Sequence, residues 1–198
     1  MYRFLKDSGG SNLSFGTAYV RDTVLYSRNA MGPLHGNALS AQIEIAPKVG
    51  DMFNGFVAGK VQARMYRRLL GSDSVVFASR FDMMTTTRAN GDFMLLCGPE
   101  ILRRCDYGSI AGNQVFYGST ELRFPIPGTA LLYQGVRGLL FLDKAYTKFS
   151  DSNIPGQKPT SYGFGLQYVV PFIGMPAQTI WKREENQWRS TFYIAVHW

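Results

Sequence analysis

Residues 188–198, WRSTFYIAVHW, close the chain, and from Thr191 onward every second residue is a large apolar one. Period-two alternation of this length indicates a β-strand. One face of that strand would carry only apolar side chains: Phe192, Ile194, Val196 and Trp198. An apolar face must be covered by a second layer of protein or by lipid, so this stretch leaves a soluble sandwich and a membrane barrel both open.

Similar alternating segments follow one another along the whole chain. They predict strands over residues 13–25, 37–48, 54–70, 74–88, 115–125, 130–148, 161–173, 177–185 and 189–198. Longer connections span residues 26–36, 89–114 and 149–160, and short turn clusters separate several of the other strands. We therefore expect one all-β domain over 1–198, with the short turns at one end and the long connections at the other, as in an outer-membrane barrel.

Three features favour the membrane over water. No run of about 18 apolar residues could form a membrane helix, so only strands could cross a bilayer. The predicted strands over 54–70 and 130–148 exceed the usual length of about 5–6 residues in soluble proteins. Aromatic residues recur near predicted strand ends, where an interfacial girdle would place them: Tyr19, Tyr66, Phe124, Tyr168, Phe172, Trp181 and Trp198. The sequence thus predicts an antiparallel transmembrane β-barrel.

The alternation also assigns side chains to the two faces of such a barrel. The set expected to face a wet lumen is Ser40, Gln42, Glu44, Lys60, Gln62, Arg64, Tyr117, Ser119, Glu121 and Arg123. The set expected to face lipid includes Leu39, Ile43, Val61, Met65, Phe116 and Leu122.

Composition argues against several other functions. The net charge of +7 is scattered, without a phosphate loop or an aromatic-basic motif, so we expect no nucleic-acid partner. The two histidines, His35 and His197, lie far apart in the sequence, which argues against a catalytic triad and against a metal site. We therefore expect that the protein is not an enzyme and has no cofactor. Cys97 and Cys105 could form a local disulfide or remain thiols, and the sequence does not decide between these.

Residues 101–125, ILRRCDYGSIAGNQVFYGSTELRFP, and 138–146, GLLFLDKAY, resemble the bacterial surface-antigen family of outer-membrane assembly and translocation barrels (BamA/TamA-like). A long loop of that family carries an aliphatic residue, Arg, Gly and an aromatic residue. Leu102 and Arg103 match the first two, whereas Arg104 and Cys105 replace the others. The family's later strand motifs correspond to Glu121-x-Arg123-x-Pro125 and Phe141-x-Asp143, and the final aromatic resembles its C-terminal recognition signal.

The resemblance implies that the loop folds back into the barrel and that Arg103 binds Glu121 and Asp143. Elementary electrostatics agrees, because two inward carboxylates on neighbouring strands repel each other unless a cation joins them. The planar fork of an arginine can bond both carboxylates. The alternative is that Glu121 pairs with Arg123 or Arg80, and that Arg103 stays in solvent.

The family's barrels have sixteen strands, and 198 residues supply about nine or ten, at roughly 20 residues for each strand and its connection. The chain is therefore expected to be either the C-terminal part of a larger barrel or a complete small barrel. Whether periplasmic domains lie upstream of it in a longer chain is left undecided by the sequence. The resemblance implies a non-enzymatic segment of a protein-insertion or translocation factor. It would sit in the lipid of the bacterial outer membrane, rather than that of an organelle, and its clients would be outer-membrane or secreted proteins.

Two alternatives remain open at this point. One is a passive outer-membrane barrel, acting as a pore or adhesin. The other is a soluble β-barrel that binds a small apolar ligand.

Overall fold

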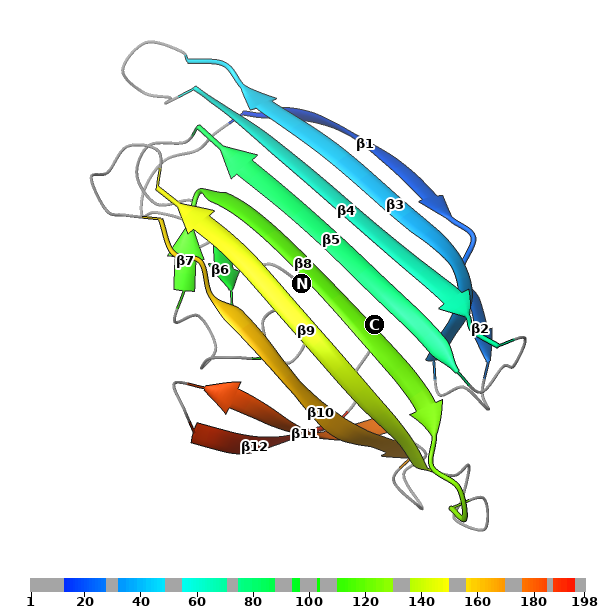
Figure 1. Ribbon diagram of the computed structural model, residues 1–198. Coiled ribbons are helices and arrows are strands. Elements are labelled where there is room, and N and C mark those ends of the chain that lie inside the picture. Colours follow the sequence, from blue (N-terminus) through cyan, green and yellow to red (C-terminus); the bar gives the residue numbers. More distant parts are fainter. Residues whose placement is uncertain are drawn as a thin grey trace.

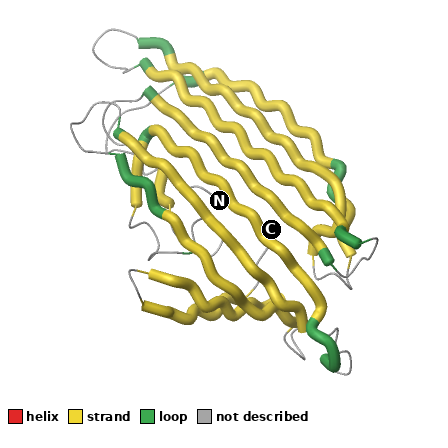
Figure 2. Tube along the Cα trace, viewed as in Figure 1, coloured by secondary structure: helices red, strands yellow, loops and turns green. Residues whose placement is uncertain are grey.

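The structure, a computed structural model, describes residues 13–27, 32–48, 55–70, 75–87, 94–96, 103, 110–129, 136–149, 156–169, 176–184 and 187–194. These residues form strands and their connections, as the tube in Figure 2 shows. Within the described residues, no helix is long and apolar enough to cross a membrane.

Most of the chain forms one antiparallel sheet, which contains 10 strands (Figure 1). Its main path is β1 (Phe15–Asp22), β3 (Gly32–Ala46), β4 (Phe56–Arg68), β5 (Val76–Thr86), β8 (Gln114–Pro125), β9 (Val136–Lys148), β10 (Thr160–Val169), β11 (Pro176–Glu184) and β12 (Gln187–Ile194). The short β2 (Leu25–Ser27) pairs with β3, while β6 (Met94–Leu96) and β7 (Ile110–Gly112) form a separate pair. Among the described residues β1 and β12 do not pair, so the sheet is open.

The expected all-β fold is confirmed, and each predicted strand corresponds to one strand of the main path. Three short strands, β2, β6 and β7, were not predicted, and β3 begins at Gly32 rather than at residue 37. The start of β3 was missed because Gly32, Pro33 and Gly36 are residue types typical of turns. In the structure, Gly36 has a φ of 119°, and a Cβ there would lie 2.2 Å from the carbonyl oxygen of Thr23. Gly36 thus permits a close approach of two chain segments inside a strand.

The long connections do not all lie at one end of the sheet, so that prediction is wrong. The connections over 87–113 and 149–159 share one end, which we call the loop end (Figure 1). The connection that contains β2 lies at the opposite end, the turn end, together with the connection over 69–75. The reason is topological: three antiparallel strands separate the β2 connection from the one over 87–113, and each strand reverses the direction of the chain.

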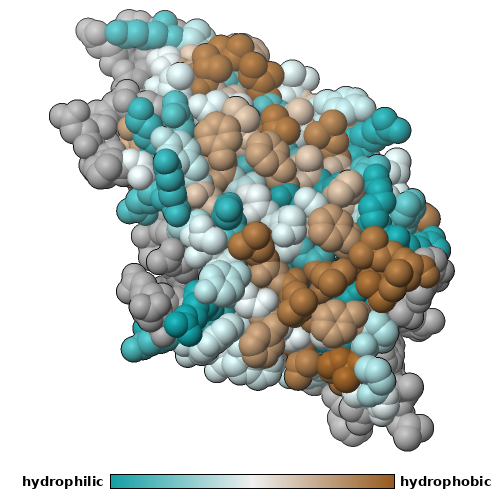
Figure 3. Space-filling model, viewed as in Figure 1, coloured by the Kyte–Doolittle hydropathy of each residue, from teal (hydrophilic) through white to brown (hydrophobic). Residues whose placement is uncertain are grey.

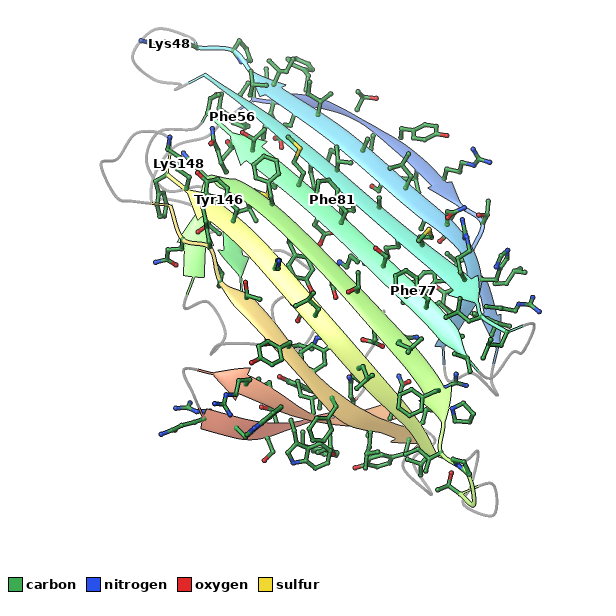
Figure 4. The ribbon with its side chains drawn as sticks, in the orientation of Figure 1. Lys48, Phe56, Phe77, Phe81, Tyr146 and Lys148 are labelled. Atoms are coloured by element: carbon green, nitrogen blue, oxygen red, sulfur yellow. The ribbon has the colours of Figure 1, made fainter. Side chains whose placement is uncertain are left out.

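The sheet curls, so it has an inner and an outer face (Figure 1). The inner face is buried along β5, β8 and β9, where Val115, Tyr117 and Leu139 are all almost inaccessible to solvent. Large apolar side chains are exposed on the outer face, such as Phe81 and Leu140. Figure 3 shows hydrophobic residues spread over this outer face, and Figure 4 shows Phe77 and Phe81 of β5 along it.

Strand pairing agrees with the face assignment made from the sequence. Gln62 lies opposite Ser40 on β3 and Asp82 on β5, whereas Val61 lies opposite Ala41 and Met83. Each of these two rows therefore keeps to one class of side chain. This consistency fixes the register, because a slip by one residue would exchange the two faces.

Tyr66 does not belong to an outer aromatic girdle, contrary to the prediction. Its side chain is 3% exposed, and it lies on the inner face between Gly36 and Ala78. Alternation along β4 places it on the same face as Arg64, so its position near the strand end did not decide its direction. Tyr19, Phe124, Tyr168 and Trp181 lie on the outer side of their strands; Phe172 and Trp198 lie outside the described residues.

The face assignment can be tested by placing a charge on neighbouring positions of β4. Val61→Arg should lower the free energy of unfolding by about 2–4 kcal/mol, because an arginine facing lipid near the bilayer midplane loses its hydration. Gln62→Arg should change it little, since this side chain points toward Asp82 on the inner face. Denaturant unfolding in lipid vesicles measures both variants. Equal losses would contradict the assignment.

Candidate functional site

The candidate site lies on the inner face of β8 and β9. These strands pair so that Ser119 lies opposite Asp143 and Glu121 lies opposite Phe141. Alternation turns all four side chains inward, and the two carboxylates are buried, Glu121 at 2% exposure and Asp143 at 0%. Buried carboxylates require hydrogen-bond donors or cations, because an isolated charge is costly in a medium of low polarity.

Arg103 supplies one of these cations from the chain between β6 and β7. It is 1% exposed, and its guanidinium binds Asp143 in a forked manner, with Nε 3.0 Å from Oδ2 and Nη2 2.8 Å from Oδ1. Its Nη1 donates to Oε2 of Glu121 at 2.8 Å. Its Nη2 also donates to Oγ of Ser119 at 3.1 Å, and its backbone N–H to Oδ2 of Asp143 at 3.2 Å. The segment that carries Arg103 is therefore bonded to the inner face of two neighbouring strands.

Glu121 is shared between two arginines. While Oε2 accepts from Arg103, Oε1 accepts from Nε of Arg123 on the same strand. The sequence left pairing with Arg123 open as an alternative to pairing with Arg103, and the structure contains both contacts. Arg80 instead pairs with Asp82 on its own strand. The two carboxylates are thus matched by two guanidinium groups.

An aromatic ring completes the surroundings of Arg103. The guanidinium carbon lies 4.0 Å from the ring centroid of Phe141, within the range of a cation–π contact. The ring in turn lies beside Gly163 of β10, where a Cβ would come within 2.9 Å of it. The absence of a side chain at Gly163 leaves room for the ring that supports Arg103.

The electrostatics of the site keep Arg103 charged. Burial alone would disfavour the cation, but the carboxylates of Asp143 and Glu121 outweigh it and raise the pKa of the guanidinium above its usual value. Within the part of the chain that the structure describes, no group of three His, Cys, Asp or Glu side chains could hold a metal ion. What the arrangement can do chemically is to anchor a segment of chain by charge-assisted hydrogen bonds.

The structure thus brings together Arg103, Glu121 and Asp143, the three residues named from the sequence. It adds Ser119 and Phe141, whose part in binding Arg103 was not predicted. Inward alternation was the signal for Ser119, and the Phe141-x-Asp143 motif was the signal for Phe141. Of the predicted C-terminal recognition strand, Phe192 is exposed on β12 opposite Thr179, and Ile194 lies opposite Ala177. Val196 and Trp198 lie outside the described residues, as do Leu102, Arg104, Cys97 and Cys105.

Comparison with known proteins decides the family. Residues 53–194 match the Omp85 superfamily domain, a region that contains the whole site. The chain belongs to the Omp85 superfamily. The expected resemblance to the surface-antigen family of outer-membrane barrels is thereby confirmed.

A solved structure supports the Omp85 fold independently. The crystal structure of BamA from Haemophilus ducreyi lacking POTRA domains 1–3 superposes with a TM-score of 0.66 at 21% sequence identity. The match covers 91% of this chain and 40% of the BamA chain, so the sequence spans less than half the length of that relative. No curated protein matches the sequence.

Removal of the Arg103 side chain tests whether the buried bonds anchor the loop. Arg103→Ala should lower the free energy of unfolding by about 3–5 kcal/mol, or less where water screens the site, since a buried carboxylate loses its cation. The main loss should be at Asp143, which is left without the cation of Arg103, because Glu121 retains its ion pair with Arg123. Arg103→Lys should rescue only in part, as an ammonium cannot make the forked contact. Protease digestion of residues 87–113, together with denaturant unfolding, measures both effects.

Two controls sharpen this comparison. Arg104→Ala removes the adjacent arginine, and it should leave protease protection unchanged. Asp143→Asn in the Arg103→Ala background should recover part of the lost stability, because no uncompensated charge remains. Damage from Arg104→Ala with a silent Arg103→Ala would contradict the assignment of the anchoring residue.

Proposed function

We propose that this chain is the barrel segment of a non-enzymatic factor that inserts or translocates proteins at the bacterial outer membrane. The observation that carries the proposal is the anchoring of a loop arginine, Arg103, to Glu121 and Asp143 inside an Omp85 sheet. These bonds fix the position of Arg103 on the inner face of β8 and β9. A factor that handles client chains benefits from an interior whose shape is fixed in this way.

The edge of the sheet suggests how a client would be engaged. Within the described residues, β12 pairs with β11 alone. An unpaired edge presents backbone donors and acceptors that can template a further strand. We propose that clients, outer-membrane or secreted proteins, pair with the barrel at a weak seam beside this strand. Phe192, Ile194, Val196 and Trp198 would form the recognition strand by which the chain itself is assembled.

The outer face supports placement in a bilayer. Its exposed side chains include large apolar groups over several strands, as Figure 3 shows. An apolar surface of this extent is unfavourable in water and favourable against lipid. The match covers 40% of the BamA chain, and we propose that the complete activity belongs to the whole protein that carries this barrel segment.

Complementation in cells depleted of the native protein tests the proposal. We expect the Arg103→Ala protein to lose most of its ability to support insertion of new outer-membrane proteins, because the loop is no longer fixed. Arg104→Ala should support insertion normally. The measurement is the folded fraction of newly made client barrels, with the membrane level of each variant determined in parallel. Two results would contradict the proposed role. One is normal client insertion in depleted cells that express no replacement protein, and the other is normal insertion by an Arg103→Ala protein whose loop is released.

A further inference from the structure

Aromatic rings cluster on the outer face of β10, β11 and β12 toward the loop end. Phe164 stacks on Trp181, with centroids 5.4 Å apart and planes 17° apart, and lies 5.6 Å from Trp188. Trp188 is 51% exposed. The guanidinium carbon of Arg183 lies 5.9 Å from its ring centroid. A cation thus sits at the border of an exposed aromatic surface.

The same combination recurs on β9. Tyr146 points outward beside Phe116, and the ammonium of Lys158 lies 5.9 Å from the centroid of its ring. Lys144 and Lys148 are also exposed on this strand, and Figure 4 shows Tyr146 and Lys148 at its loop end. We call Lys144, Tyr146, Lys148, Lys158, Phe164, Trp181, Arg183 and Trp188 the basic-aromatic belt.

The turn end of the same strands differs in charge. The described side chains on their outer face there are uncharged, and they include Leu140, Leu166, Tyr168, Thr179 and Phe192. All described cations on the outer face of β9–β12 therefore belong to the belt, and no described acidic side chain accompanies them. Interfacial aromatic residues position a barrel at the headgroups, but they do not require cations, so the charge needs its own explanation.

A cation at headgroup height attracts anionic lipids, and a guanidinium bonds phosphate oxygens in a forked manner. The rings beside Lys158 and Arg183 would keep these two cations at the membrane surface while their charges face outward. We infer that the basic-aromatic belt binds anionic phosphate headgroups of the leaflet at the loop end of the barrel. This inference rests on the membrane placement in the proposed function and adds a lipid preference to it.

The tryptophans of the belt can report on the neighbouring lipid. The protein has three tryptophans, so Trp198→Phe leaves only Trp181 and Trp188. This protein is reconstituted in mixed phosphatidylcholine and phosphatidylglycerol vesicles in which one lipid at a time carries brominated acyl chains, since bromine quenches tryptophan on contact. At equal mole fraction, we expect brominated phosphatidylglycerol to quench more strongly. Raising the salt concentration should weaken this preference in the same protein.

Variants then assign the preference to the belt. Arg183→Gln should lower the relative affinity for phosphatidylglycerol about five-fold, the value of one cation near an anionic membrane surface. Arg183→Lys should retain most of it. Arg21→Gln, which removes an exposed arginine from the outer side of β1, should leave it unchanged.

The outcomes separate the inference from the proposed function. Equal quenching by the two brominated lipids, or a preference that survives Arg183→Gln and high salt, overturns the lipid inference and leaves membrane placement intact. Absence of quenching by either lipid contradicts membrane placement itself.

Discussion

Glu121 and Asp143 bury two carboxylates on the inner face of neighbouring strands, and this constraint governs the surrounding structure. Charged groups that are buried away from water need partners of opposite sign. The chain supplies one from the same strand, Arg123, and the other from the connection between β5 and β8, Arg103. Because Arg103 lies in a connection, these bonds hold that residue of the connection on the inner face. The register of β8 and β9 and the position of Arg103 are therefore coupled.

Packing supports the same contact from a third strand. Phe141 lies under the guanidinium of Arg103, and Gly163 leaves space for its ring. The site thus depends on β8, β9 and β10 together, and distortion of any of the three would displace the arginine. Hydrogen bonds to Ser119 and Asp143 fix the orientation of the planar guanidinium. The ammonium of a lysine would act as a point charge and would have no such fixed orientation.

The two faces of each strand perform different tasks at the same time. The inner face of β9 holds Asp143 and Phe141 against the loop, while its outer face carries Leu140 toward the turn end and Tyr146 toward the loop end. In an Omp85 barrel this division allows the interior to be organised by charge and the exterior by lipid. In the proposed function, a client that pairs with the edge of β12 would meet both environments at once.

The sequence by itself determined the strands and the side chains that share a face, because the period of two is a property of the extended backbone. It placed Glu121 on the inner face and Val61 on the outer face, and the resemblance singled out Arg103. Only the tertiary structure decided that Glu121 bonds both Arg103 and Arg123, and that Phe141 supports the guanidinium. It also decided that β3 begins at Gly32, and that the first residues of this strand pass close to Thr23. These features depend on distances between segments that are remote in the chain, and no local pattern encodes such distances.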